Sequence, residues 1–359
     1  MTIIDRYIIK QFIQTLVYSI LALYFIFIIV TLMENLDEFL DQGVDTIIII
    51  KYYLYYFPEI TKLMTPVSML LATLFSVGRL ASLNEVTAMK TGGQSLYRLM
   101  LPILLFGMAL SFWQLYFNGW VVPPSIERKN EIERVYLKKK KTTNSIYNLY
   151  FRDTPTRNLS INYYNSDGKY GRNFAIEEFT NDDKPRLISR IEAANVKWDE
   201  DNNDWLLLNV LQKNFNDTLY SKSLDSLHLS LKIDHSQLVK LKKELEEMDF
   251  TELKQYIDLL EQGGKDVSKQ LIEYNAELAF PFANFIIVLF GVPFASIKKK
   301  GGMAVQIAAA LVVSFCYLIF TEISKTIALA NNLDPLISGW LANLVFLVFS
   351  LIIVLRTKT

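Results

Sequence analysis

The stretch FIQTLVYSILALYFIFIIVTLM, residues 12–33, has 22 residues without a charged side chain. A helix needs about 20 mostly apolar residues to cross the hydrocarbon core of a bilayer. The stretch is too long for the apolar region of a signal peptide, and no small-residue cleavage site follows it. It therefore predicts a retained membrane-spanning helix.

Five more apolar stretches follow along the chain. Four of them are long enough to span without help: residues 99–122, 278–297, 301–321 and 335–355. The other, residues 63–78, has only 16 residues between Lys62 and Arg79, so we expect its helix to extend outward past Lys62, or Lys62 to snorkel. The tyrosine-rich residues 47–57 before it suit a membrane interface. The chain is thus predicted to cross a membrane six times.

The basic residues of the short loops predict the orientation, because cytoplasmic loops are enriched in Lys and Arg. With the N-terminus inside, ten of them fall on the inner side and three on the outer side. The inner residues are Arg6, Lys10, Arg79, Lys90, Arg98, Lys298, Lys299, Lys300, Arg356 and Lys358, and the outer ones are Lys51, Lys62 and Lys325. Both termini are therefore expected in the cytoplasm, and the long polar insert on the opposite side of the membrane.

The insert between the third and fourth spans reads as β-structure. Two strand-like runs surround an Asn-Ser-Asp-Gly turn within residues 161–179, and two more surround a DEDNND turn within residues 186–215. Residues 226–233 alternate apolar and polar side chains. Meandering antiparallel strands of this kind favour a sandwich or jelly roll.

Helices are expected on both sides of these strands. The basic residues 126–141 continue the third span outward, and Asp249 with Glu252 is typical of a capping box that opens a helix to Leu260. The predicted fold class is a membrane α-helical protein of three plus three spans with an inserted all-β, jellyroll-like domain. Its parts are residues 1–124, 125–272 and 273–359.

Composition excludes several classes of function. The 37 basic residues balance 37 acidic ones, which disfavours a general nucleic-acid binder. Gly264-Lys265 lacks the upstream glycine and the following Ser or Thr of a phosphate-binding loop, so we expect no ATP hydrolysis, no bound cofactor and no enzyme activity. His228 and His235 could pair on a metal, but surface or strand positions are the favoured interpretation, and we predict no metal site. Cys316, in the fifth span, is expected to be a buried, inert thiol.

The loop of residues 79–100 has a pattern that suits a partner contact. We expect an amphipathic helix over residues 82–90, ended by Gly92-Gly93. In that helix Glu85 could pair with an arginine of a partner, while Val86 and Met89 supply apolar contact. Periodicity alone favours the simpler interpretation, an interfacial connector with a solvated Glu85.

Three charged groups near the outer side form a candidate cavity for a lipid headgroup: Lys62, Glu322 and Lys325. The alternative is that Glu322 and Lys325, three residues apart on one helix, neutralise each other. Two further charged stretches have simpler explanations. Residues 34–45 read as a solvated acidic loop, and the lysines of residues 291–302 read as topology markers.

Several motifs in a fixed order resemble the LptF/LptG permease family of lipopolysaccharide export. They are IIDRYIIKQF near the N-terminus, TPVSMLLATLFSVGRLASLNEVTAMKTGGQSLYRL at residues 65–99, GVPFASIKKKGG at residues 291–302, and LANNLDPLISGWLANLVF at residues 329–346, where the matching residues are Pro335, Trp340 and Asn343. Each piece is weak alone, but their order and the insert make the likeness specific over the whole chain. The opening residues lean toward the LptG branch.

This resemblance implies a mechanism. Family members pair as an LptF–LptG heterodimer with two copies of the ATPase LptB, which binds the ATP. Residues 82–93 would be the coupling helix, with Glu85 as the acid that contacts the ATPase. Spans one and five would form lateral gates, and lipopolysaccharide would pass from the outer leaflet of the inner membrane through the β-jellyroll to LptC and an LptA-like bridge.

Two departures from the family pattern affect the expected phosphate contacts. Some relatives carry basic residues just after the first span, where this chain has Glu34, Asp37 and Glu38. Many carry a basic residue four positions before the proline of span four, where this chain has Glu277. The hypothesis is that Lys62 or Lys325 compensates.

Two other functions remain open at this stage. One is a membrane-anchored scaffold whose β domain recruits envelope proteins, although a scaffold needs neither a coupling loop nor a charged outer cavity. The other is an exporter subunit for another lipid.

Overall fold

The computed structural model describes residues 3–137, 145–182, 185–215, 220–231, 233–235, 238, 243–262, 264–296 and 302–357. The chain forms two compact units. A helical unit comprises residues 1–139 and 268–359, and a β unit comprises residues 140–267. Some predictions concern residues outside this described part. They are the inner-side position of Lys298–Lys300 and Lys358, and the helical continuation of the third span over residues 138–141.

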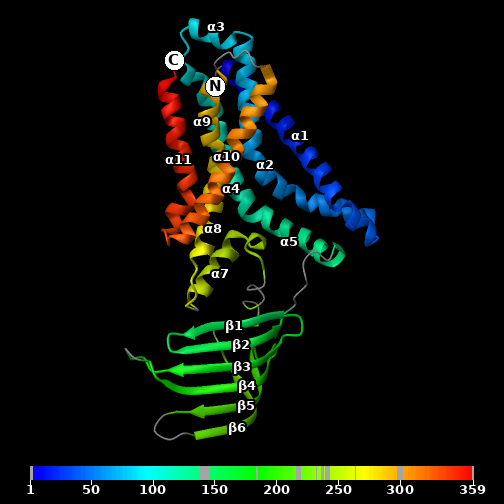
Figure 1. Cartoon of the computed structure of the whole chain (residues 1–359), viewed down its shortest axis with the longest axis vertical. Coiled ribbons are helices and arrows are strands. Elements are labelled where there is room, and N and C mark those ends of the chain that lie inside the picture. The colour runs from blue at the N-terminus through cyan, green and yellow to red at the C-terminus, as the bar shows by residue number, and fades with distance from the viewer. Residues whose placement is uncertain are drawn as a thin grey trace. The chain divides into compact units, whose positions relative to one another are not determined.

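The helical unit (Figure 1) holds six helices that are long and apolar enough to cross a membrane, counted over the described part of the chain. Its elements are α1 (Ile3–Asp41), α2 (Thr46–Ser82), α3 (Glu85–Thr91), α4 (Leu96–Tyr116), the π-helical turn η1 (Phe117–Val121), α5 (Val122–Ile132), the π-helical turn η2 (Glu133–Leu137), α8 (Ser268–Ala279), the 3₁₀ turn η4 (Phe280–Phe282), α9 (Ala283–Ala295), α10 (Gly302–Ala330) and α11 (Pro335–Arg356). The third span continues from α4 through η2, and the fourth runs from α8 through α9.

The acidic residues after the first span lie in a helix, so the prediction of a loop from residue 34 is wrong. Helix α1 continues to Asp41, and the turn comes only at Gly43, whose φ is +59°. Asn35 and Phe39 lie four residues apart and are both buried, and the ring of Phe39 contacts that of Tyr52 on α2. This buried stripe holds the extension as a helix while the acidic side chains lie on its other faces.

The second span extends outward, as the short apolar stretch required. Helix α2 begins at Thr46, where Asp45 caps it by accepting a hydrogen bond from the backbone N–H of Ile47. The tyrosine-rich residues 47–57 belong to this helix. Lys62 is therefore an internal residue of a long helix and not its end.

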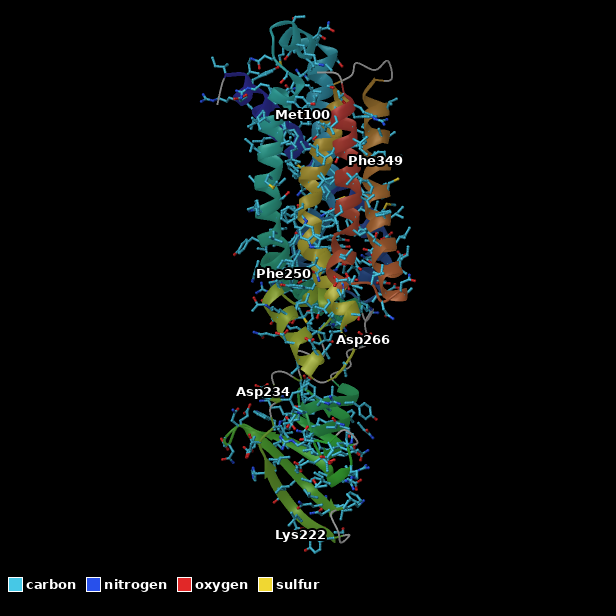
Figure 2. The ribbon with its side chains drawn as sticks, turned by 90° about the vertical axis from the view of Figure 1, so that its left-hand side faces the viewer. Met100, Lys222, Asp234, Phe250, Asp266 and Phe349 are labelled. Carbon is cyan, nitrogen blue, oxygen red and sulfur yellow. The ribbon has the colours of Figure 1, made fainter. Side chains whose placement is uncertain are left out.

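The six spans differ in how much of each is buried inside the helical unit. Helix α2 and the α8–α9 span are mostly buried, whereas α1 and α10 are mostly exposed. The core around α2 includes Leu70, Leu74 and Val77, with Val288 and Val292 from α9. Figure 2 labels Met100 on the third span and Phe349 on the sixth, and Met100 is 2% exposed.

The β unit is one antiparallel sheet of six strands in sequential order, within the described residues. Its strands are β1 (Ser145–Thr154), β2 (Arg157–Asn165), β3 (Tyr170–Phe179), β4 (Leu187–Asp199), β5 (Asp204–Asn214) and β6 (Tyr220–Leu229), and they are followed by the 3₁₀ turn η3 (Leu245–Glu247) and α7 (Phe250–Gln262). The all-β insert is confirmed, and both predicted hairpin turns lie between paired strands. Within the part of the insert that the structure describes, the strands pair in sequence order as a meander.

The core of the β unit lies on one face of the sheet. Trp205, Tyr164 and Phe174 are each 1% exposed or less, and the indole N–H of Trp205 donates to the carbonyl of Ile233 at 2.8 Å. The predicted helix at Asp249 is also present, because the carboxylate of Asp249 accepts from the backbone N–H groups of Thr251 and Glu252 at 2.8 Å.

Candidate functional site

Helix α3 lies at one end of the helical unit, between α2 and α4, and both chain termini lie at this end (Figure 1). It is shorter than predicted, because α2 runs to Ser82 and Asn84 adopts a left-handed conformation with φ +61° that separates the two helices. The predicted end is correct: the backbone N–H of Gly92 donates to the carbonyl of Ala88, and Gly93 takes φ +81°.

The three predicted contact residues of α3 differ in accessibility. Val86 is 4% exposed and belongs to the chain's own core, so it is not free for a partner. Met89 is partly buried against that core. Glu85, in the first turn, is half-buried, and its carboxylate accepts a long hydrogen bond of 3.5 Å from the hydroxyl of Tyr7. Glu85 and Met89 are thus the residues of this set that a partner can reach.

A hollow lies between α3, the start of α1 and the start of α4. Its walls include Ile8, Met89 and Leu99, together with the ion pair of Arg98 and Asp5 at 3.1 Å. The hollow is small, with room for about one water molecule, so a docked protein would contact its rim and the exposed surface of α3 beside it.

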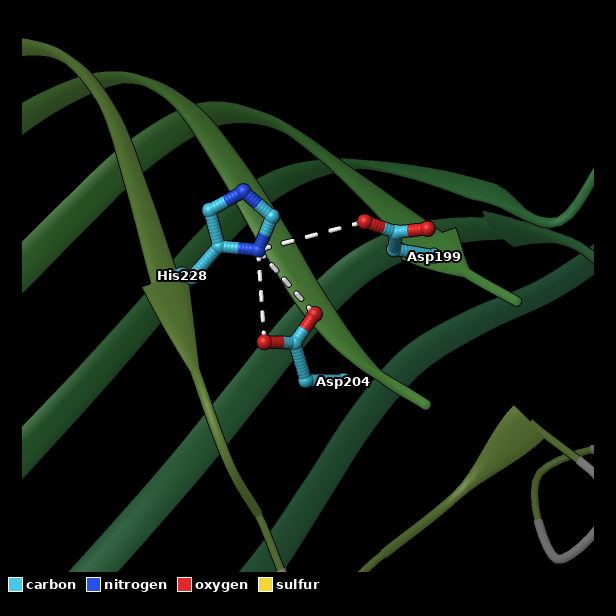
Figure 3. Close-up of side chains that lie close together, drawn as sticks. All are labelled: Asp199, Asp204 and His228. Carbon is cyan, nitrogen blue, oxygen red and sulfur yellow. Dashed lines mark hydrogen bonds and ion pairs between the residues drawn. The ribbon is translucent and has the colours of Figure 1, made fainter. Parts of the chain in front are cut away.

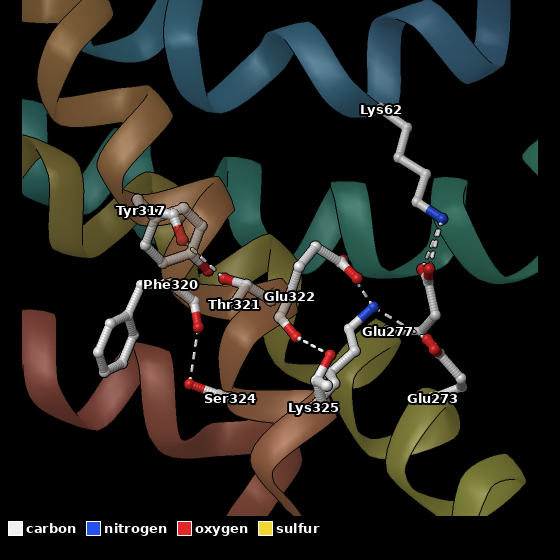
Figure 4. A network of polar contacts seen from close by, with 10 residues as sticks. Lys62, Glu273, Glu277, Tyr317, Phe320, Thr321, Glu322, Ser324 and Lys325 are labelled. Carbon is white, nitrogen blue, oxygen red and sulfur yellow. Dashed lines mark hydrogen bonds and ion pairs between the residues drawn. The ribbon is translucent and has the colours of Figure 1, made fainter. Parts of the chain in front are cut away.

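The second predicted group forms a cluster that joins three helices (Figure 4). The ammonium group of Lys62 on α2 lies 2.7 Å from the carboxylate of Glu277 on α8. The ammonium group of Lys325 on α10 lies 3.0 Å from Glu273 on α8 and 2.9 Å from Glu322 on its own helix. The structure pairs Lys325 with Glu322, as one interpretation of their spacing predicted. It also pairs Lys325 with Glu273 on α8, which the spacing did not predict.

These five residues, Lys62, Glu273, Glu277, Glu322 and Lys325, are called the outer charge cluster after their predicted side of the membrane. Both of its lysines are paired and largely buried. Each ammonium side chain is 15% exposed, whereas Glu273 and Glu277 are 33% and 30% exposed and Glu322 is 71% exposed. An anionic group that binds here must displace a glutamate from a lysine. The cluster is therefore an ion-pair network and not an open cationic site.

Glu277 accounts for the charge of Lys62. Its carboxylate neutralises the ammonium group of Lys62 across the interface between α8 and α2. The positive charge at this level of the bundle is thus on α2.

A proline in α2 decides where Lys62 lies. Pro66 has no N–H, so the carbonyl of Lys62, four residues earlier, loses its helical partner. The side-chain amide of Gln114 on α4 donates to that carbonyl at 3.1 Å, and the amide of Asn284 on α9 donates to Gln114 in turn. This chain of amides fixes the bend of α2 against α4 and α9.

The two groups of residues lie on opposite sides of a membrane-thick layer. From Lys62 to Ser82, where α2 ends beside α3, the helix has 20 residues, which corresponds to about 30 Å at 1.5 Å per residue. That length matches the hydrocarbon core of a bilayer, which is about 30 Å thick. The two polar groups of the helical unit are therefore separated by about the thickness of the hydrocarbon core of a bilayer.

Comparison with known protein families matches residues 6–356 to the description "Lipopolysaccharide export system permease LptF/LptG". The chain belongs to the LptF/LptG family. Among curated proteins, it is 18% identical over 357 residues to the lipopolysaccharide export system permease protein LptG of Escherichia coli strain K12, covering 99% of this chain and 98% of the relative. The same figures hold for LptG of Escherichia coli O6:H1.

The β unit of this LptF/LptG protein holds a set of possible metal ligands (Figure 3). The imidazole Nδ1 of His228 lies 3.1 Å from Asp204 and 4.0 Å from Asp199. Local bonds account for these groups: the Asn202 side chain donates to Asp199 and lowers the pKa of that carboxyl, and His228 bonds Asp204 across the β5–β6 pair. We assign no metal to this surface set.

The remaining sequence candidates have structural roles. His235 accepts or donates a 2.6 Å hydrogen bond with the buried hydroxyl of Tyr164 and lies apart from the His228 set. Gly264 and Lys265 close the C-terminal end of α7 by donating to the carbonyls of Glu261 and Leu260. Cys316 is exposed on α10, so the prediction of a buried thiol is wrong, because the side of the helix that carries it does not face the core.

Sequence reasoning missed the residues that tie the spans of this LptF/LptG protein together. Glu273 completes the outer charge cluster, and its spacing of four from Glu277 is a signal that both face one way. Gln114 and Asn284 are uncharged, so neither interrupts the apolar stretch that predicts its span. Amides in an apolar span are also unusual and mark contacts between helices.

Proposed function

We propose that this chain is the transmembrane permease subunit of an ABC-type exporter that extracts lipopolysaccharide from the outer leaflet of the bacterial inner membrane. The observation that carries the proposal is the pairing of two polar groups about 30 Å apart on one helical unit, a short helix at one surface and an ion-pair cluster at the other. Family membership supplies the substrate class.

Helix α3 is the docking point for the cytoplasmic ATPase in this proposal. A dimer of the LptB type binds there and hydrolyses the ATP, since this chain has no phosphate-binding loop of its own. Glu85 offers a carboxylate to a basic group of the ATPase, and Met89 offers an apolar contact beside the hollow. A paralogous LptF or LptG subunit completes the permease.

The outer charge cluster receives the headgroup. Lipid A phosphates are anionic, and they compete with Glu277 for Lys62 and with Glu273 and Glu322 for Lys325. Residues of the insert, about 125–272, lie in the periplasm and pass the lipid through LptC to an LptA-like bridge. Both termini lie in the cytoplasm with α3.

The first experiment is co-purification of the tagged chain from its native membrane with mass spectrometry of bound protein and lipid. The wild type is expected to retain an LptB-like ATPase and lipopolysaccharide. Glu85→Arg reverses the charge at the contact and is expected to reduce ATPase recovery roughly tenfold or more. Asp41→Arg makes the same reversal at an exposed position far from α3 and serves as the matched control.

Each outcome of this experiment decides between functions. Envelope proteins recovered without an ATPase would contradict the exporter and support the scaffold. An ATPase recovered with a different lipid would retain the transport mechanism and overturn the substrate. Equal loss of the ATPase in both variants would remove Glu85 from the contact.

The second experiment tests the lysines by measuring bound lipopolysaccharide per purified complex. Lys62→Gln and Lys325→Gln each remove a charge-assisted contact, which is worth about 1.5–3 kcal/mol, and both are expected to lower lipid binding. Glu277→Gln removes the carboxylate that pairs with Lys62 and is expected to raise the amount of bound lipopolysaccharide. Lys51→Gln, on the exposed outer part of α2, is the control. Unchanged binding in both lysine variants would exclude these residues from the site.

A further inference from the structure

The fourth span is broken in the middle of the helical unit. Helix α8 ends at Ala279, the 3₁₀ turn η4 covers Phe280–Phe282, and α9 continues from Ala283. Pro281 lies in this turn and has no N–H to donate to the preceding turn. Backbone carbonyls at such a break need partners from other helices, because lipid offers none.

One of these carbonyls is bonded by the sixth span. The side-chain amide of Asn343 on α11 donates to the carbonyl oxygen of Ala279 at 2.5 Å. The amide oxygen of Asn343 in turn accepts from the hydroxyl of Tyr317 on α10 at 2.8 Å. Both side chains are less than 5% exposed, so this chain of hydrogen bonds runs from α10 through α11 to the break without solvent.

Helix α11 packs closely against α8 next to this series of hydrogen bonds. A Cβ atom at Gly339 would lie 2.6 Å from Cβ of Asn275 and 2.7 Å from the backbone N of Ala276, so the two helices meet at backbone distance. Asn343 is one helical turn after Gly339. The position of its amide is therefore set by the contact between α8 and α11.

Helix α10 is held more loosely. Its outer face exposes Phe315, Ile319 and Ile323. Polar bonds tie it to the fourth span at two levels, Tyr317 through Asn343 and Lys325 through Glu273. The two levels are eight residues apart, which corresponds to about 12 Å along the helix. The ring of Tyr317 also packs against Phe280 of the break and Phe346 of α11, at centroid distances of 6.5 and 5.3 Å.

These contacts give the two levels different properties. The Lys325 level is at the polar edge, where an anionic headgroup can displace Glu273. The Tyr317 level is buried, and a hydrogen bond lost there leaves polar atoms unpaired in an apolar medium. A ligand at the outer level therefore frees one attachment of α10 and leaves the other in place.

We propose that Tyr317 and Asn343 are positioning residues for lipid transfer: they form the pivot on which α10 turns when Lys325 leaves Glu273, and they transmit this movement to the break in the fourth span. This inference rests on the proposed transport function. Neither residue touches the substrate. Because α8 carries Glu273 and Glu277 on the outer side of the break, movement at the pivot alters the partners of both lysines.

The test uses the native Cys316, the only cysteine in the chain, which is exposed and adjacent to Tyr317. A nitroxide spin label on Cys316 reports the mobility of α10 in the full complex with its ATPase and paralogous subunit in nanodiscs. The variants are Tyr317→Phe, Asn343→Leu and the pair of both. Ser350→Ala is the matched control, since Ser350 is a fully buried polar residue of α11 whose hydroxyl bonds carbonyls of its own helix, Phe346 and Leu347.

The expected result is non-additive. Each single variant raises label mobility and lowers lipopolysaccharide transferred per ATP hydrolysed by roughly 5-fold or more, the lower end of typical coupling between sites. The double variant is no worse than either single one, because one chain of bonds has already been cut. Ser350→Ala leaves both readouts unchanged. A role in folding alone would lower transport and ATP hydrolysis together and leave their ratio unchanged.

Two results would overturn the proposal. One is an unchanged ratio and mobility in Tyr317→Phe, which keeps the aromatic ring and its packing and so folds even if Asn343→Leu does not. The other is full additivity of the two substitutions. If the wild-type complex moves no lipopolysaccharide, the proposed function fails, while the mobility measurement still decides whether Tyr317 and Asn343 hold α10.

Discussion

The two units of this chain sort their side chains in opposite ways. In the helical unit Gln114 and Asn284 are at most 1% exposed, while Phe315 and Ile319 are 59% and 57% exposed. In the β unit Val196 on β4 is fully buried, while the next residue, Lys197, is exposed. The outward side of the helical unit is thus apolar, which suits contact with hydrocarbon, and the outward side of the sheet is polar, which suits contact with water.

The largest effect is expected from emptying the core of the β unit. Trp205→Ala removes a fully buried indole and its bond to Ile233, so the β unit is expected to lose about 3–5 kcal/mol of unfolding free energy. Hydrogen exchange of β-unit peptides in the full chain measures this loss. Tyr220→Ala, at a 61% exposed strand position, should change exchange little. Similar exchange in both variants would mean that the sheet has no core on this face.

The next prediction tests the contrast directly by placing the same charge on an exposed apolar residue of each unit. Ile319→Lys puts an ammonium group on the outward face of α10, which is expected to cost about 2.5–3.5 kcal/mol for membrane insertion. Tyr220→Lys, on an equally exposed residue of β6, should be tolerated. Yield of inserted full chain and glycosylation mapping of the segment measure the effect. Equal tolerance would place α10 away from lipid.

A smaller effect is expected where helices of the membrane unit meet. Gly339→Ala forces a methyl group against the backbone of α8 and should destabilise the chain by about 1–3 kcal/mol. Gly107→Ala is the control, because its Cβ would meet neighbouring atoms at ordinary distances of 3.5 Å or more. Thermal unfolding of the detergent-solubilised chain compares the two. If Gly107→Ala is the more harmful, the close contact of α8 and α11 does not stabilise the unit.

The smallest expected effect is a pH dependence confined to the β unit. Burial beside Tyr164 lowers the pKa of His235 below its ordinary value of 6.5. The positive charge of Lys169 lowers this pKa further, and the carboxylates of Asp234 and Glu200 oppose the shift only in part. The folded state therefore binds fewer protons than the unfolded state, so stability is complete above pH 6.5 and falls as the pH decreases through that value.

Hydrogen exchange at pH 7.5 and 5.5 measures this change. His235→Gln cannot titrate and should lose less β-unit stability than the wild type between these pH values. Exchange in peptides of the helical unit should respond equally in both proteins. A wild type that becomes more stable in acid would reverse the sign and contradict the lowered pKa.

Much of the fold could be predicted because it depends on local pattern. Runs of uncharged residues near the length of a bilayer gave all six spans, and alternation around the turn at Asn165, whose side chain accepts from the N–H of Gly168 at 2.7 Å, gave a hairpin. The helical end of α1 was missed because its acidic residues resemble a loop until Phe39 is seen to pack on Tyr52. Alternation shows which face of each strand is buried, but not which element covers that face.

The candidate site, too, has features that follow from nearby residues and features that depend on tertiary contacts. Residues close together in the chain were enough to predict a membrane unit with an inserted β unit and a short helix after the second span. They left the self-pairing of Glu322 with Lys325 as one of two interpretations. Tertiary packing was needed to show that Glu273 and Glu277 pair with the two lysines, that Val86 is buried, and that Asn343 joins Tyr317 to Ala279. Those contacts link residues 26 to 215 positions apart or depend on the rotation of a helix about its axis, which only packing between helices fixes.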